Sequence, residues 1–247
     1  MKKIFKRLGF TLAEILIVIG IIGGVAIMVL PTLKDNYEEH VFEARAKATY
    51  NILQQAVALS KYSGDRYYGA DPEVFFNKYI KESIKLARND GDTENCYDRI
   101  YTGENIPSPM ALDGTTIKKV GGILSAFNKP YNFSLNNGAE VYIGTAAKTV
   151  FNLHMVDNYP SDSALIIIFD TNGGSEPNIY GLDIFFTYWN GRELVPLGDK
   201  VSLQNVNKNC STSGGDIDLG MWNGTYCLQY MIDNGWKLKK EIKDKFL

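Results

Sequence analysis

An unbroken apolar run close to the start constrains this chain more than any other feature. Residues 15–31 are seventeen uncharged and mostly apolar residues, and Glu14 carries the only ionisable side chain between residues 8 and 33. A helix of about 20 residues crosses the hydrocarbon core of a bilayer, so the run is nearly long enough to span one. A charged side chain at that depth costs about 2.5 to 3.5 kcal/mol on insertion scales, which makes Glu14 a candidate functional residue.

Charge is distributed unevenly along the chain. Lys2, Lys3, Lys6 and Arg7 give the first nine residues a charge of +4, which leaves −6 for the remainder of a chain whose formal net charge is −2. A basic end before an apolar span favours a cytoplasmic N-terminus and an exported remainder. The sequence has no broad basic patch, and we predict no nucleic-acid partner.

The apolar run differs from the core of a secretory signal peptide. Such a core has about 7 to 15 apolar residues and is followed by a cleavage site of small residues. Here the run is longer, and the strongest local break, Gly9, precedes it. Cleavage at that break would leave the apolar helix on the mature protein. On composition alone, a plain N-terminal membrane anchor is the alternative.

The residues "KRLG" followed by "FTLAE" resemble the processing signal of type IV pilins and type II secretion pseudopilins, and the resemblance covers about the first 60 residues. It implies that a prepilin peptidase cuts between Gly9 and Phe10 and methylates the new N-terminal Phe10. Gly9 has no side chain, so the backbone around the scissile bond can enter a protease cleft in an extended form. Removal of residues 1–9 also removes four positive charges that hold the segment at the cytoplasmic face.

The resemblance assigns Glu14 a role in filament assembly. After cleavage the amine of Phe10 is charged, and in a fibre of parallel helices it can face the Glu14 carboxylate of a neighbouring subunit. A buried charge is tolerated mainly when it is paired, and breaking such a pair costs about 3 to 5 kcal/mol. The implied partners are other pilin or pseudopilin subunits, the prepilin peptidase, an inner-membrane platform protein of the assembly machine and membrane lipid. The predicted location is the cytoplasmic membrane, crossed once with the head outside, and then the fibre.

Pro31 lies 21 residues after Phe10, where many pilins have a helix kink. Proline in a helix interior removes a hydrogen bond and clashes with the preceding turn. We therefore predict a helix kink at Pro31, with a bend or local melting near residues 27–31.

Beyond Pro31 apolar residues recur at steps of three and four among charged residues to about Ser63, after which Gly64 can end the helix. The predicted divisions are a cleaved leader at 1–9, a transmembrane and fibre-core helix at 10–33, an amphipathic helix at 34–63 and a globular head at 64–247. A further helix is predicted at 72–88, with Phe75, Tyr79 and Leu86 facing a core.

Two Asn-Gly pairs, Asn137-Gly138 and Asn190-Gly191, each separate two alternating runs, which is the strongest short signal for a β-hairpin. Together with the run "ALIIIFDTN" they predict an antiparallel sheet of four or more strands. The predicted fold class is α+β and pilin-like, with the long helix packed on the sheet of the head.

The chain has three cysteines, Cys96, Cys210 and Cys227. An exported head permits their oxidation. A disulfide between Cys210 and Cys227 would close a loop of 16 intervening residues and be worth about 3 kcal/mol. It would resemble the disulfide-closed C-terminal region of many pilins, so we favour it. The alternatives are that Cys96 pairs with either of the others or stays free.

The stretch "DTNGGSEPNIYGLD" is the one candidate metal site. Asp170, Asn172 and Asp183 offer oxygen ligands around a glycine pair that allows a tight turn, which suits calcium. The stretch departs from the EF-hand loop, because its twelfth position carries no acid and one oxygen pair is missing. An Asx-rich turn between two strands is the favoured alternative. Calcium is therefore the only candidate cofactor.

An anchored enzyme and a tip subunit are the rival classes. Catalysis has weak support, because His40 and His154 are isolated and no Gly-x-Ser-x-Gly or His-Glu-x-x-His pattern occurs. A substrate-binding tip subunit, or minor pilin, would use the strand "IFFTYW" as an aromatic face, although alternation predicts that half of those rings belong to the core. We predict that the chain is not an enzyme but a structural subunit of a pilus or a secretion pseudopilus.

Overall fold

The computed structural model describes residues 11–60, 67, 69–91, 109–116, 128–147, 163–213 and 222–247. The chain divides into two compact units, Met1–His40 and Val41–Leu247, called below the N-terminal and the C-terminal unit. Gly9, Phe10 and Cys96 lie outside the described residues. The architecture is α+β, with an apolar N-terminal helix and a six-stranded antiparallel sheet.

Helix α1 runs from Leu12 to Ser60, so a long helix over most of residues 10–63 is confirmed. Its backbone stays helical through Pro31, and of the two alternatives at residues 27–31 only a bend remains a prediction. Inside the C-terminal unit its buried side chains recur at the spacing of one helix face. These residues are Phe42, Glu43, Ala46, Thr49, Leu53, Ala56 and Val57.

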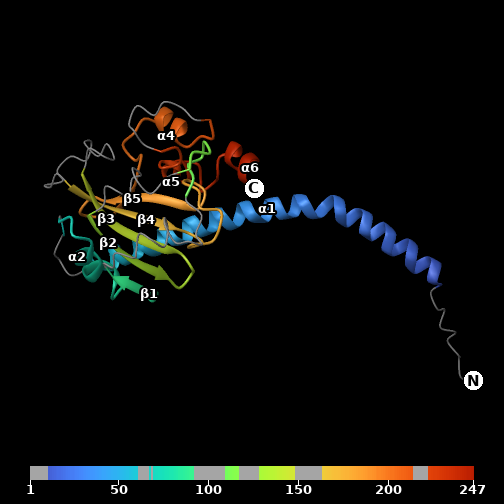
Figure 1. Cartoon of the computed structure of the whole chain (residues 1–247), viewed down its shortest axis with the longest axis horizontal. Helices are drawn as coiled ribbons and strands as arrows, with labels where there is room; N and C mark the ends of the chain where they lie inside the picture. The colour runs from blue at the N-terminus through green and yellow to red at the C-terminus, as the bar shows by residue number, and fades with distance from the viewer. Residues whose placement is uncertain are drawn as a thin grey trace, which may run out of the picture. The chain divides into compact units, whose positions relative to one another are not determined.

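The sheet has the strand order β1-β2-β3-β4-β5-β6, and each strand pairs antiparallel with the next along the chain. Figure 1 shows β1 to β5 following one another across the sheet in this order. The strands are β1 Leu86–Gly91, β2 Asn128–Leu135, β3 Glu140–Ala147, β4 Ser163–Asp170, β5 Ile184–Trp189 and β6 Leu194–Pro196.

Both predicted hairpins are confirmed. Asn137 and Gly138 lie between β2 and β3, and Asn190 and Gly191 lie between β5 and β6. Each glycine has a positive φ, 88° at Gly138 and 86° at Gly191, a backbone conformation that glycine adopts without steric cost. The two Asn-Gly pairs therefore form the hairpin turns that the sequence predicted.

The predicted helix at 72–88 is wrong over its second half. Only α2, Pro72–Phe75, and a π-helical segment η2, Phe76–Ile80, are helical, and β1 begins at Leu86. The predicted core residues Phe75 and Tyr79 are buried, whereas Leu86 is half-buried in the strand. Pairing with β2 supplies β1 with backbone hydrogen bonds, and this tertiary contact overrides the helical pattern of the sequence.

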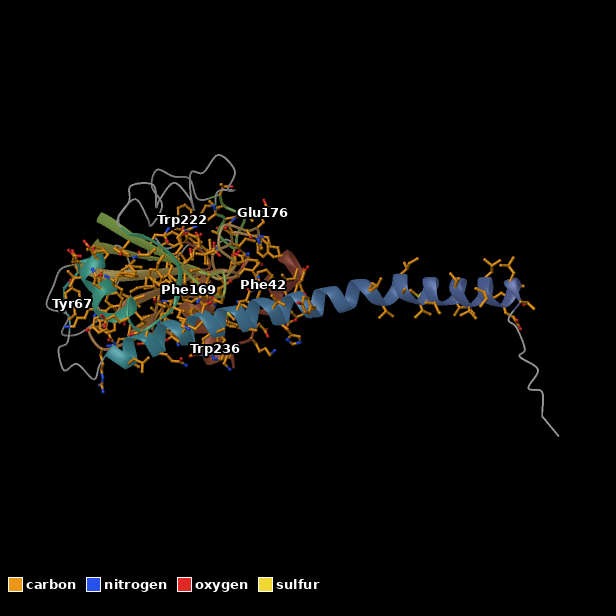
Figure 2. All side chains as sticks on the ribbon, turned by 90° about the horizontal axis from the view of Figure 1, so that it is seen from below. Phe42, Tyr67, Phe169, Glu176, Trp222 and Trp236 are labelled. Atoms are coloured by element: carbon orange, nitrogen blue, oxygen red, sulfur yellow. A yellow bond between two sulfur atoms is a disulfide. The ribbon has the colours of Figure 1, made fainter. Side chains whose placement is uncertain are left out.

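All six residues of β5 are buried, so its rings belong to the core in full and not only by half, as alternation predicted. Phe75 and Tyr79 cover one end of the strand, with ring centroids 5.2 and 4.9 Å from that of Trp189. Phe169 of β4 lies 5.5 Å from Phe185, and Figure 2 shows it inside the unit. Strand β5 therefore offers no exposed aromatic face.

In the described residues after the sheet, three short helices occur: α4 Leu203–Asn209, α5 Cys227–Asp233 and α6 Lys240–Phe246. Figure 1 shows them gathered on the β5 side of the sheet, where α5 contacts β5 and α4. Ser202 caps α4, because its side-chain oxygen accepts a hydrogen bond from the N–H of Asn205 at 3.3 Å.

Candidate functional site

The carboxylate of Glu14 has a partner at the start of α1. Its Oε2 accepts hydrogen bonds from the backbone N–H and the hydroxyl of Thr11, each at 2.8 Å, and the N–H of Glu14 returns a bond to Thr11 Oγ1 at 3.2 Å. This reciprocal arrangement is a capping box, which satisfies N–H groups that the first helical turn leaves free.

Thr11 is not among the residues predicted for this site, although the sequence carries a signal for it. A Ser or Thr followed three residues later by Glu, just before an apolar run, marks a capping box, and "TLAE" fits that pattern. The structure thus gives Glu14 a role within its own chain: it caps the first turn of the helix. A role of Glu14 in contacts between chains stays a prediction.

The apolar part of α1 is exposed throughout the N-terminal unit. One stretch, Leu12–Leu30, is long and apolar enough to cross a membrane. Every side chain along it is exposed except that of Ala26, which is half-buried. A shallow groove on this stretch is apolar and is lined by Ile21, Ile22, Val25, Ala26, Val29 and Leu30. A surface of this kind needs lipid or another apolar chain to cover it.

The glycines of this stretch leave open space on the helix surface. A Cβ built on Gly20, Gly23 or Gly24 would meet no atom within 4 Å, leaving aside the helix's own nearby backbone. Small residues allow apolar helices to approach one another closely. The processing residues Gly9 and Phe10 lie outside the described part of the chain, and cleavage between them stays a prediction.

The structure joins Cys210 and Cys227 in a disulfide, with the Cα atoms 4.8 Å apart, and this is the pair that the sequence favoured. Both residues are buried, at the end of α4 and the start of α5. The bond therefore ties the two helices together at their adjoining ends.

Asn209 reinforces this connection from the inside. Its buried side chain donates to the carbonyl of Trp222 at 3.1 Å and accepts from the N–H of Tyr226 at 2.8 Å and from the hydroxyl of Thr225 at 3.1 Å. A buried amide with several hydrogen bonds favours one arrangement of the chain around it. These bonds therefore connect the end of α4, next to Cys210, to the residues just before Cys227.

The predicted metal ligands converge where β4 ends and β5 begins. Asp170 is the last residue of β4 and pairs in register with Ile184, the first residue of β5. Asp183 immediately precedes that strand, and its carbonyl accepts the N–H of Thr171 at 2.9 Å. Antiparallel pairing therefore brings together two acids that lie thirteen positions apart in the sequence.

Each acid uses one of its oxygens locally. Oδ1 of Asp170 accepts from the N–H of Asn172 at 3.1 Å, and Oδ1 of Asp183 accepts from the N–H of Ile179 at 2.7 Å. The other oxygens, Oδ2 of both acids and Oδ1 of Asn172, are buried and have no hydrogen-bond partner among the described residues. Buried polar atoms without partners are rare, because their desolvation is not compensated.

Burial also shifts the titration of the pair. It raises the pKa of Asp183 to about 8, although the hydrogen bond from the Ile179 N–H lowers it. Burial raises the pKa of Asp170 well above its usual range, and the nearby charge of Asp183 raises it further. Burial therefore disfavours the charged form of both acids.

The other candidate catalytic or metal-binding side chains are not grouped into a site in the described residues. His40 is exposed on α1, and His154 lies outside the described ranges. Over the described ranges, no group of three or more His, Cys, Asp or Glu side chains is placed to hold a metal ion. Any cation at Asp170 and Asp183 would need amide, backbone or water oxygens as its other ligands.

No protein-family model, curated protein or solved structure matches the chain. Its function must be inferred from its own residues and their arrangement.

Proposed function

We propose that this chain is a structural subunit of a type IV pilus or a type II secretion pseudopilus. One combination of features carries the proposal: a Gly-Phe cleavage signal, a Glu four residues after the Phe, and an exposed apolar helix that begins there. In the proposed mechanism the peptidase removes residues 1–9, and the exposed apolar stretch holds the subunit in lipid until it packs against neighbouring helices in the fibre.

The α+β architecture and the Cys210–Cys227 disulfide are compatible with this role. The apolar surface at Leu12–Leu30 supports it further, because its side chains are exposed in the single chain and can be buried by parallel copies of the same helix. A plain membrane anchor would share that surface. It would need neither the cleavage signal nor an acid at position 14.

In the assembled fibre, Glu14 pairs with the charged amine that cleavage creates at Phe10 of a neighbouring subunit. The capping box with Thr11 satisfies Glu14 before that pairing, and so lowers the cost of holding an acid in the membrane. Thr11 contributes both of its donors to one oxygen, Oε2, while Oε1 remains for the incoming amine.

Production of the chain in a bacterium with its own filament machinery and prepilin peptidase tests the proposal. The membrane-extracted protein should have the mass of residues 10–247 plus one methyl group. Sheared fibres should contain it along their length, as judged by immunogold labelling. Labelling confined to fibre tips would support the minor-pilin alternative, and an uncut chain would contradict the proposal.

The role of Glu14 requires a matched comparison. Glu14→Val should be cleaved and methylated normally but should be absent from the sheared fibre fraction. Glu73→Val replaces an exposed glutamate of the C-terminal unit and should assemble as the wild type does. Normal assembly of Glu14→Val would refute the proposed pairing.

A further inference from the structure

Helix α1 carries a second stripe of side chains, called below the outer stripe, that does not face the core. Its members recur along one side of the helix and are exposed or half-buried. They are Val41, Arg45, Ala48, Ile52 and Leu59. At about 100° per residue, the outer stripe lies roughly a quarter of a turn away from the buried stripe that begins at Phe42.

Two hydrogen bonds show which strands lie on either side of α1. The hydroxyl of Thr49 accepts a bond at 3.1 Å from Nδ2 of Asn137, in the turn between β2 and β3. On the other side, the hydroxyl of Tyr50 donates at 3.1 Å to the carbonyl of Leu194 in β6. Arg45 precedes Thr49 by four residues and shares its side of the helix. The outer stripe is therefore on the β2 side of α1, nearly opposite the β6 side.

Two acids lie on the β6 side, close to Tyr50. Glu193 directly precedes Leu194, whose carbonyl is bonded to Tyr50. Burial raises the pKa of the Tyr50 hydroxyl, and the charges of Glu193 and Asp199 raise it further, although a hydrogen bond from Gln54 lowers it. Both acids are exposed, and neither forms an ion pair within the part of the chain that the structure describes.

The β6 side stays acidic near Tyr50 in spite of nearby cations. Lys47 lies over the ring of Trp236, which in turn packs on Tyr50. Arg192 and Lys200 are neighbours of the two acids in the sequence. The charges that act on the Tyr50 hydroxyl are nevertheless those of the acids.

Arg45 is the one charged member of the outer stripe. Its side chain is exposed, and among the described residues it forms no ion pair. No acid lies three or four residues from it along the helix, where such a pair would form within the chain. The outer stripe therefore presents a cation between apolar side chains, and the β6 side presents two acids.

These opposite charges lie at different positions along α1. The carbonyl of Leu194 accepts from both Tyr50 and Gln54, so its level is midway between these two residues. About seven residues of helix separate Arg45 from that level, or about 10 Å. A parallel copy displaced by about 10 Å toward the C-terminal end of α1 would bring its Arg45 to the level of Glu193.

The pairing proposed for Glu14 requires a displacement in the same direction. Phe10 precedes Glu14 by four residues, about 6 Å along a helix, so its amine reaches Glu14 only from a neighbour displaced toward the C-terminal end. The copy that supplies Phe10 also supplies Arg45, and the copy that supplies Glu14 also supplies Glu193. The long side chains of arginine and glutamate can span the difference of about 4 Å between the two displacements.

We propose that the outer stripe of one copy docks on the β6 side of a neighbouring copy, where Arg45 pairs with Glu193 and Asp199. Such a contact joins two different surfaces, and its repetition builds an open helical filament when the copies do not close into a ring. The parallel arrangement of copies rests on the proposed function. The docking adds which surfaces of the C-terminal unit meet.

Charge reversal tests the pairing, with the sheared fibre fraction as the readout. Arg45→Glu should be cleaved normally but reach the fibres at least about 10-fold less than the wild type, because like charges then face each other. Glu193→Arg should have a smaller effect in the same direction, since Asp199 remains. The double variant Arg45→Glu with Glu193→Arg restores opposite charges at every contact and should assemble better than either single variant.

Two controls separate a lost contact from lost folding. Lys208→Glu reverses an exposed lysine of α4 and should assemble as the wild type does. Arg45 and Glu193 are exposed and have no ion pair in the described part of the single chain, so the Tm of their variants should stay within about 2 °C of the wild type.

The outcomes distinguish this contact from the proposed function. Wild-type fibre yield in Arg45→Glu, or no recovery in the double variant, would overturn the pairing and leave the proposed function standing. Absence of the wild-type chain from fibres would overturn the proposed function and the docking with it.

Discussion

The carboxylate of Glu43 on α1 accepts the backbone N–H of Leu238 at 3.0 Å, a contact that joins residues 195 positions apart. The other carboxylate oxygen accepts Lys237 Nζ at 2.7 Å. Glu43 is buried, whereas the Lys237 side chain is 54% exposed. The bond to the backbone is therefore the protected one, and the ion pair is open to solvent.

This difference predicts that replacing Glu43 lowers the free energy of unfolding more than replacing Lys237 does. Glu43→Ala should destabilise the C-terminal unit by about 1 to 3 kcal/mol, because a buried N–H loses its acceptor. Lys237→Ala should cost less than about 1 kcal/mol, as exposed ion pairs do. Thermal unfolding of the two variants measures both values. Equal losses would show that the ion pair, not the backbone bond, holds the segment.

Gly224 should tolerate no side chain. Its φ is +106°, and a Cβ would lie 2.1 Å from the carbonyl oxygen of Tyr180, so Gly224→Ala combines backbone strain of about 1 to 3 kcal/mol with a steric clash. Gly235→Ala is the matched control, because Gly235 also has a positive φ, +66°, but open space around it. We expect Gly224→Ala to lower the Tm distinctly more than Gly235→Ala; equal effects would argue against the tight packing at Tyr180.

Loss of the disulfide should destabilise the C-terminal unit by about 2 to 5 kcal/mol. The paired variant Cys210→Ser with Cys227→Ser should unfold at the same temperature as the reduced wild type. A reducing agent should not lower the Tm of that variant further. A further drop would reveal a disulfide between two copies of the chain through Cys96, the one cysteine that the variant retains.

Tyr226 predicts a loss of stability at alkaline pH. Burial raises the pKa of Tyr226 to about 12, and its hydroxyl has no hydrogen-bond partner among the described residues. An unfolded tyrosine loses its proton near pH 10, so between about pH 10 and 12 the folded state binds more protons and stability falls as pH rises.

The variant Tyr226→Phe should reduce this alkaline slope and leave stability at pH 7 nearly unchanged, because it removes only an unpartnered hydroxyl. Denaturant titrations at pH 8, 9, 10 and 11 measure the slope. Tyr37→Phe, at a side chain that is 69% exposed, should keep the wild-type slope. A wild-type slope in Tyr226→Phe would assign the effect to another tyrosine.

The sequence predicted the elements whose signals are local. The long helix follows from an apolar run that becomes an apolar stripe, and the hairpins follow from Asn137-Gly138 and Asn190-Gly191. Strand β1 could not be predicted in this way, because "LARNDG" has no alternation and is a strand only through its pairing with β2. The burial of Trp189 at the end of β5 likewise depends on Phe75 and Tyr79, which come from a distant segment.

The same distinction between local signals and contacts made in the folded chain applies to the candidate sites. Residue types and spacing sufficed to select Asp170, Asn172 and Asp183, whereas the Cys210–Cys227 pair was favoured through the resemblance to pilins. They could not tell which oxygens a turn would satisfy, because that depends on the N–H groups of Asn172 and Ile179 in the folded loop. They also could not show that Gly181 of this loop lies against Cys227, since that contact is made in three dimensions.

The strand order has a consequence for the way the sheet can form. Every strand pairs with its predecessor in the chain, so each new strand finds its partner already made when the chain emerges with its N-terminus first. Loop closures between consecutive strands cost less entropy than the pairing of distant ones. The helices α4 and α5 come after the last strand, and their cysteines cannot be joined before Cys227 has emerged. Oxidation is thus a closing step that locks a sheet already complete.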